Sequence, residues 1–145
     1  DNSCVIKYCK NEALNLILSS YADQARDAEI DVQISVTATD FARFQITDLC
    51  SLFANALENA IHACEKIPTS EKRYITLKVF EKNDRICINI ANNYIQNPVF
   101  ENEIPTSHEA NHGIGVRSMI SVVEKYHGVY GFFTENKEFR FQASL

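Results

Sequence analysis

Apolar side chains recur at every third or fourth position between residues 47 and 66, and this spacing predicts the clearest helix of the chain. The positions that carry the spacing are Leu49, Leu52, Phe53, Ala56, Leu57, Ala60, Ile61 and Cys64. Thr47 can act as the N-cap of this helix, and Pro68 follows its end. One face of the helix is therefore expected to lie in a hydrophobic core.

Two further stretches show the same helical spacing. Residues 11–30 are predicted to form a helix with Asn11 as its N-cap. Residues 115–127 predict another helix, and Gly128 is expected to be its C-terminal stop.

Alternating apolar residues predict strands, and turn residues join four of these into two hairpins. The strands are expected at 31–38, 73–82, 85–91, 129–134 and 138–144. Asn83-Asp84 and Asn136 mark the hairpin turns. Adjacent hairpins imply a mixed, largely antiparallel sheet, with helices on one face. The expected fold class is thus an α/β (α+β) two-layer sandwich.

Residues 94–112 have no hydrophobic period and lie between the first hairpin and the last helix. They contain Pro98 and Pro105 together with many Asn, Ser and Thr residues. A loop of this length inside a compact domain is often functional. We therefore expect residues 94–112 to form a mobile lid.

Composition excludes several classes of function. The 145 residues are 46% apolar and 23% charged, which suits one packed domain. A formal net charge of −5 argues against nucleic acid as the main partner, because phosphate binding needs a basic surface. No apolar run approaches the ~18 residues of a membrane helix, and there is no signal peptide, so no membrane contact by this domain is expected. The five cysteines form no CxxC pair, which favours reduced thiols in a cytoplasmic domain.

Four polar residues form a stripe along the predicted 47–66 helix, away from its apolar face. These are Asn55, Asn59, His62 and Lys66. A solvated face is one interpretation, but asparagine is a poor helix former because its amide competes for the backbone. An amide oxygen is also a hard, neutral ligand that suits Mg²⁺. The stripe is therefore a candidate ligand-binding face.

Two other motifs lie beside the expected lid. HGIGVRSM places Gly113 and Gly115 at the start of a helix, where free backbone N–H groups favour phosphate. Glycines at such junctions also occur for steric reasons alone. INIANNY, residues 88–94, ends an alternating strand with polar groups that either line a pocket floor or form an ordinary polar strand end.

In this order and spacing, the three features resemble the GHKL superfamily, named for gyrase, Hsp90, histidine kinase and MutL. DLCSLFANALENAIHACEKI is similar to the N box, INIANNY stands at the G1 box, and HGIGVRSMISVVEKYHG is similar to the G2 box. The likeness runs from about residue 11 to the end and is greatest to AgrC-type quorum-sensing and citrate-sensor-like histidine kinases. It implies the Bergerat ATP-binding fold for residues 11–145. Residues 1–10 would then end an upstream dimerisation region.

The resemblance implies roles for the stripe. Asn59 corresponds to the asparagine that binds Mg²⁺ between the ATP phosphates, and Asn55 to the earlier polar residue of the same box. His62 stands where many kinases place a basic residue that contacts phosphate, and Lys66 lies beside it among the expected ATP contacts. Glu58, next to Asn59, is kept as a residue that could assist catalysis.

The other two boxes would complete the nucleotide site. Gly113 and Gly115 correspond to glycines that close the lid over the phosphates, with Ile114 and Val116 between and after them. Asn92 aligns with the aspartate that accepts a hydrogen bond from the adenine amino group. The G1 box here has no glycine, which departs from the family pattern.

The residue at position 55 favours a kinase over a hydrolase. Related ATPases and anti-sigma-factor serine kinases carry a glutamate there as a general base, and the amide of Asn55 has no useful basicity. A histidine acceptor offers a ring lone pair and needs such a base less. His108-Glu109 is a His-acid pair, but it lies in the expected lid and is interpreted as solvated.

The expected function is binding of Mg-ATP and transfer of its γ-phosphate to a histidine in the protein's own dimerisation domain. Because the chain begins with Asp1, we expect that domain upstream, in a membrane-anchored, homodimeric sensor kinase with a response regulator as partner. An anti-sigma-type serine kinase or switch, and a nucleotide-binding pseudokinase without catalysis, are the alternatives.

Overall fold

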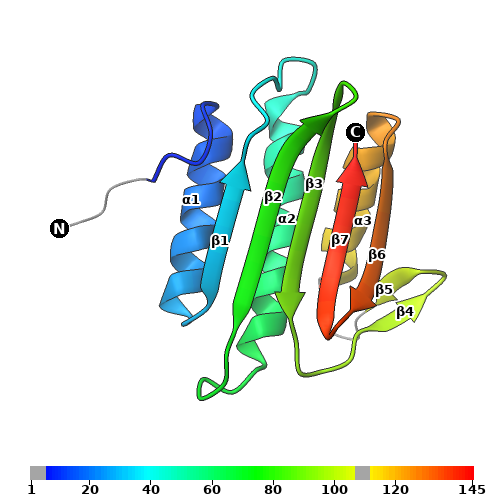
Figure 1. The fold of residues 1–145 in the computed structure, drawn as a ribbon. Helices are drawn as coiled ribbons and strands as arrows, with labels where there is room; N and C mark the ends of the chain where they lie inside the picture. Colours follow the sequence, from blue (N-terminus) through cyan, green and yellow to red (C-terminus); the bar gives the residue numbers. More distant parts are fainter. Residues whose placement is uncertain (1–5, 107–111) are drawn as a thin grey trace.

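The computed structural model describes residues 6–106 and 112–145, with the backbone alone for residues 112–114. This part of the chain forms a five-stranded sheet in the order β1-β2-β3-β7-β6, a separate two-stranded hairpin, and three helices on one face of the sheet (Figure 1). The helices are α1 (Glu12–Asp27), α2 (Ile46–Glu65) and α3 (His112–Lys125). The strands are β1 (Asp31–Val36), β2 (Tyr74–Lys82), β3 (Arg85–Asn93), β4 (Val99–Glu101), β5 (Ile104–Thr106), β6 (Val129–Glu135) and β7 (Glu138–Ser144).

The predicted two-layer sandwich is confirmed. β1 pairs with β2 in parallel, whereas β2 with β3, β3 with β7, and β6 with β7 are antiparallel. The core lies between the sheet and α2, whose apolar face is the one that the spacing predicted. Leu52, Leu57, Ile75 and Ile88 are each at most 1% exposed. Burial of such side chains contributes about 1.5–3 kcal/mol each.

The segment before α1 is packed against that helix. Asn15, which is 8% exposed, accepts hydrogen bonds at Oδ1 from the N–H groups of Tyr8 (2.6 Å) and Cys9 (3.1 Å). Ser19 Oγ donates to the carbonyl of Ile6 at 2.9 Å, and Asn15 Nδ2 donates to the same carbonyl at 3.1 Å. These two buried side chains therefore fix the path by which the chain enters α1.

The predicted N-cap is confirmed for α1 and is wrong for α2. Asn11 caps α1 as predicted, with Oδ1 accepting from Leu14 N at 3.0 Å. Thr47 is not the cap of α2, because that helix begins at Ile46 and Gln45 occupies the N-cap position without a side-chain capping bond. Gln45 Oε1 instead accepts a hydrogen bond from Lys125 Nζ at 3.0 Å.

The end of α3 also differs from the expected glycine stop. His127 takes the left-handed conformation with φ of 56°, and the N–H of Gly128 bonds to Val123 O at 2.9 Å. Gly128 is needed for another reason, since a Cβ there would lie 2.5 Å from the carbonyl oxygen of Ser144. The predicted 11–30 helix likewise ends early, at Asp27, and Glu29 is left-handed.

The expected structureless loop at 94–112 contains a short hairpin, which corrects that prediction. β4 pairs with β5 across a turn at Asn102 and Glu103, both with positive φ. Residues 107–111 lie outside the described residues. α3 begins at His112 rather than 115. β3 also extends past residue 91 to Asn93, because β7 continues to pair with it.

A polar joint connects the start of α2 to the end of α3. The carboxylate of Asp48 accepts hydrogen bonds from Lys125 Nζ (2.8 Å) and from the hydroxyl of Tyr126 (2.5 Å). The hydrogen bonds from Lys125 and Tyr126 lower the pKa of Asp48. The hydrogen bond to Asp48 raises the pKa of Lys125. Tyr126 also packs edge-on against Phe44 at 4.8 Å. The joint therefore sets how α2 and α3 lie relative to each other.

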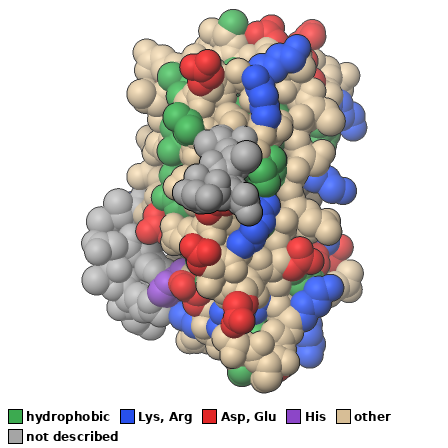
Figure 2. All heavy atoms as spheres, turned by 90° about the vertical axis from the view of Figure 1, so that its left-hand side faces the viewer, with side chains coloured by type: hydrophobic (Ala, Val, Ile, Leu, Met, Phe, Trp, Pro, Cys, Tyr) green, Lys and Arg blue, Asp and Glu red, His purple; other side chains and the backbone are tan. Residues whose placement is uncertain are grey.

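The surface beside α1 and β1 carries interspersed positive and negative side chains rather than a patch of one sign (Figure 2). No helix within the described ranges has the length and apolar character needed to cross a membrane. In the same ranges, no group of three or more His, Cys, Asp and Glu side chains is placed to hold a metal ion.

Candidate functional site

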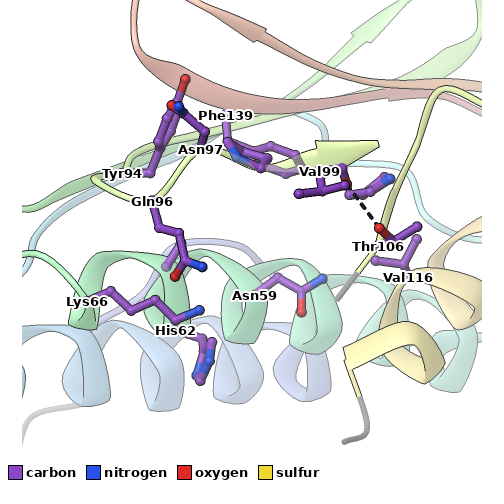
Figure 3. A pocket seen from close by; sticks show the side chains of 13 residues that line it. Asn59, His62, Lys66, Tyr94, Gln96, Asn97, Val99, Thr106, Val116 and Phe139 are labelled. Atoms are coloured by element: carbon purple, nitrogen blue, oxygen red, sulfur yellow. Dashed lines mark hydrogen bonds between the residues drawn. The ribbon is translucent and has the colours of Figure 1, made fainter. Parts of the chain in front are cut away.

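A cavity of about 250 Å³ lies between the polar stripe of α2, the β4–β5 hairpin and the start of α3 (Figure 3). Asn59, His62 and Lys66 come from α2, and Val116 comes from α3. The remaining lining residues are Ala63, Tyr94, Gln96, Asn97, Pro98, Val99, Pro105, Thr106 and Phe139. The structure thus brings three of the four stripe residues to one wall of a cavity, whereas Asn55 does not line it.

Aromatic contacts hold the hairpin over this cavity. Phe100 of β4 stacks on Phe139 of β7 with ring centroids 6.2 Å apart, and Phe139 in turn lies 6.3 Å from Phe132. Thr106 Oγ1 donates to Val99 O at 3.3 Å across the hairpin (Figure 3). Phe139 therefore both anchors the hairpin and lines the cavity.

The amides of Asn55 and Asn59 are oriented by their NH₂ groups. Asn55 Nδ2 donates to the carbonyl of Ser51 at 2.8 Å, and Asn59 Nδ2 lies 3.8 Å from the sulfur of Met119. A Cβ placed on Gly115 would lie 3.2 Å from Asn55 Oδ1 and 3.7 Å from Asn59 Oδ1. Both amide oxygens therefore face the first turns of α3. Two neutral oxygens so arranged suit a hard divalent cation such as Mg²⁺.

Gly115→Ala tests this close approach. We expect nucleotide affinity to fall by about tenfold, because a contact at 3.2 Å from Asn55 Oδ1 obliges that amide to move. Stability should not fall, since alanine in a helix interior is favoured over glycine by about 1 kcal/mol. Titration with ATP and thermal unfolding would measure the two effects.

Gly131→Ala is the matched control, because a Cβ at Gly131 meets no atom within 4 Å. It should leave nucleotide affinity unchanged. Equal affinities for Gly115→Ala and the unaltered chain would contradict the arrangement of the two oxygens.

Asn92 and Asn93 lie at the end of β3, next to the cavity residue Tyr94. Asn92 is 2% exposed and does not line the cavity, and its Nδ2 donates to the carbonyl of Asn93 at 2.9 Å. Asn93 Oδ1 accepts from Tyr74 N at 2.9 Å and thereby joins β3 to β2. Behind it, burial raises the pKa of the Cys64 thiol to about 11, which excludes a thiolate nucleophile there at neutral pH.

Other predicted site residues lie apart from the cavity lining. Glu58 is exposed on the α1 side of α2, where its charge adds to burial in raising the pKa of Tyr21. Gly113 and Ile114 lie in the first turn of α3, where the structure describes the backbone alone. The His108-Glu109 pair lies outside the described residues.

Sequence reasoning missed the second wall of the cavity. Tyr94, Gln96 and the hairpin residues were expected only as part of a lid, and Phe139 was assigned only to a strand. The prolines and apolar residues of 94–106 were the available signal. Nothing in the alternation of β7 separates Phe139 from a residue that serves packing alone.

Comparison with known proteins decides the family. A family model described as the GHKL domain matches residues 44–145, which include α2, the cavity residues and α3. This chain belongs to the GHKL domain family. The matched part of this GHKL domain begins just before α2, so that α1 and β1 precede it. No curated protein matches the chain in sequence.

Solved structures share the GHKL fold along nearly the whole chain. The nucleotide-free catalytic domain of histidine kinase ThkA aligns with a TM-score of 0.72 at 17% identity, over 93% of this chain and 90% of that chain. The mycobacterial sensor histidine kinase MprB gives 0.69 at 14% identity, over 92% and 91%. ThkA in complex with the response regulator TrrA gives 0.67 at 16% identity, over 95% of this chain and 40% of that chain. At these identities the likeness concerns the fold.

Proposed function

We propose that this GHKL domain binds ATP with Mg²⁺ and transfers the γ-phosphoryl group to a histidine of a dimerisation domain in the same protein. The observation that carries the proposal is the pair of amide oxygens, Asn55 Oδ1 and Asn59 Oδ1, directed at the first turns of α3 beside the cavity. The base would lie in the cavity and the phosphates between α2 and the N-terminal end of α3.

The cavity suits a flat aromatic base. Tyr94 and Phe139 offer ring surfaces, and Val99 adds an apolar contact. Asn92, with its NH₂ group bound to Asn93 O, offers Oδ1 as an acceptor for the adenine amino group. Lys66, on the same wall as Asn59, supplies positive charge toward the phosphates, and His62 beside it supplies a ring that can form hydrogen bonds.

The asparagine pair fits Mg²⁺. Asn59 is proposed as the direct ligand, and Asn55 stands one helical turn earlier with its oxygen on the same side. When bound, the ion would neutralise phosphate charge during transfer. The NH₂ contacts to Ser51 and Met119 keep both oxygens turned toward that position.

Transfer to histidine needs positioning more than a base. The lone pair of an imidazole nitrogen forms the new N–P bond, and the bond from the γ-phosphorus to the bridging oxygen breaks with its electron pair passing to ADP. The proton of the other ring nitrogen is then released to solvent. Asn55, as an amide, does not withdraw a proton from water, which limits hydrolysis in competition with transfer.

We further propose the AgrC-like or citrate-sensor-like subtype, on the motif resemblance described above. Residues 94–112 would act as a lid, which the position of the β4–β5 hairpin beside the cavity supports for its described part. The protein would be a homodimeric, membrane-anchored sensor kinase with this domain in the cytoplasm. A response regulator is the proposed partner of the full-length kinase, as TrrA is of ThkA.

A pseudokinase is the second candidate, favoured by the altered G1 box. Asn92 stands where the family pattern has aspartate, and Tyr94 stands where it has the first glycine. The side chains of Asn92 and Asn93 are both hydrogen-bonded within the protein. Such a domain would bind nucleotide only weakly, or would bind it without transferring the phosphoryl group.

The isolated chain should bind ATP, hydrolyse it very slowly, and phosphorylate its own dimerisation region when the two are mixed. The product should be labile in acid and stable in base, as expected for phosphohistidine. Radiolabelled transfer, with the acceptor histidine replaced by alanine as control, would measure this. Rapid turnover by the isolated chain would indicate a hydrolase, and absence of ATP binding would favour the pseudokinase.

A further inference from the structure

A second hollow lies between α2 and α3. Ser51 of α2 lines it together with Arg117, Ser118, Ser121 and Val122 of α3. It is therefore lined by three hydroxyl groups and one guanidinium. Such groups donate hydrogen bonds to anions.

The hollow and the cavity are connected through one line of side chains on α2. Ser51, Asn55 and Asn59 follow one another at four-residue spacing and so share a face of the helix. Asn59 lines the cavity, Ser51 lines the hollow, and the amide of Asn55 between them donates to Ser51. A nucleotide with its base in the cavity and its phosphates at the asparagines would thus extend toward the hollow.

Arg117 differs from every other arginine of the chain. Within the described ranges it forms no hydrogen bond, ion pair or ring contact, and its side chain is exposed. The other five contact protein groups: Arg26, Arg43, Arg73, Arg85 and Arg140. Side chains on a helix lean toward its N-terminus, so Arg117 leans toward the turn that contains Gly115.

We propose that Arg117, with the hydroxyls of Ser51 and Ser118, binds the γ-phosphoryl group of ATP and stabilises its charge during transfer. This inference rests on the proposed function. A guanidinium presents two parallel N–H donors that match two phosphoryl oxygens. Those oxygens carry the charge while the N–P bond forms and the bond to the bridging oxygen breaks, so donors held there accelerate transfer.

Binding of a triphosphate compared with a diphosphate tests the proposal on this chain. Arg117→Ala should weaken binding of a non-hydrolysable ATP analogue by about tenfold and leave ADP affinity unchanged, because only the triphosphate has the γ group. Arg117→Lys should recover part of the lost affinity, since lysine keeps the positive charge but lacks the two parallel N–H donors of the guanidinium. Arg85→Ala is the control, since Arg85 contacts Ser144 O at the β2–β3 turn, away from the hollow.

Each other result would overturn the proposal. Equal weakening for both nucleotides would assign Arg117 a structural role. Unchanged affinities for both would indicate a residue that serves a partner protein or solvent only. If the unaltered chain bound neither nucleotide, the proposed function itself would fail. If it bound ADP and the analogue equally well, the γ-phosphoryl assignment alone would fail.

Discussion

Replacing Asn59 by alanine is expected to abolish Mg²⁺-dependent nucleotide binding while the fold remains intact. Asn59 lines the cavity, its Oδ1 lies toward Gly115 of α3, and alanine removes that oxygen without adding bulk. Residues that merely orient metal ligands already contribute about 10–100-fold to metal affinity, so the loss of a direct ligand should exceed that range. Calorimetric titration with ATP, in the presence and absence of Mg²⁺, would measure the effect.

Asn59→Ala also tests whether Asn59 is a metal ligand or only a packing residue. Asn89→Ala, on β3, is the matched control and should bind as the unaltered chain does. Amide exchange of residues 94–106 should slow when a non-hydrolysable analogue is added to the unaltered chain, and should not slow in Asn59→Ala. Titration curves that coincide for Asn59→Ala and the unaltered chain would refute the assignment.

Placing glutamate at position 55 is expected to raise ATP hydrolysis by up to about 10²–10⁴-fold, the contribution of a positioned general base. The carboxylate would lack the NH₂ group that now donates to the carbonyl of Ser51. It would therefore be free to turn toward the first turns of α3, where the amide oxygen already points. Steady-state release of phosphate by the isolated chain would measure the change.

Asn55→Gln is the control for this substitution. Glutamine has the length of glutamate and no basicity, so its hydrolysis rate should stay at the level of the unaltered chain. A similar increase in both variants would show that side-chain length, rather than basicity, controls water attack. No increase in Asn55→Glu, with ATP binding retained, would place the attacking water out of reach of position 55.

The parts of this molecule that were predictable are those with a long, regular pattern. The apolar face of α2 repeats along the whole helix, so both its burial and the opposite asparagine stripe followed from spacing. β4 and β5 are three residues each, which is too short for a period of two to appear. Their positions depend on contacts such as that of Phe100 with Phe139, between residues far apart in the chain.

Local signals failed where tertiary contacts replaced local ones. Thr47 has the side chain of an N-cap, but Gln45 takes that position, where its amide oxygen accepts from Lys125 at the end of α3 and its backbone N–H donates to Tyr126, which follows α3. His127 adopts the conformation expected of glycine, and Gly128 gives space to the end of β7 instead. The orientation of the Asn55 and Asn59 amides was likewise not predictable, because it depends on Ser51 and Met119.

The hydrogen bonds of Asp48 fix the C-terminal end of α3 to the start of α2, so a tilt of α3 would pivot about that end. Lys125 and Tyr126 are held there, whereas Gly115 lies near the opposite end, where an added Cβ would be 3.2 Å from Asn55 Oδ1 and 3.7 Å from Asn59 Oδ1. A helix of 14 residues is about 20 Å long, so a tilt of a few degrees about its C-terminal end displaces its far end by about 1–2 Å. A displacement of that size is enough to separate or join oxygen ligands of a metal ion. A change at Asp48 would therefore be expected to reach the turn that contains Gly115 along α3.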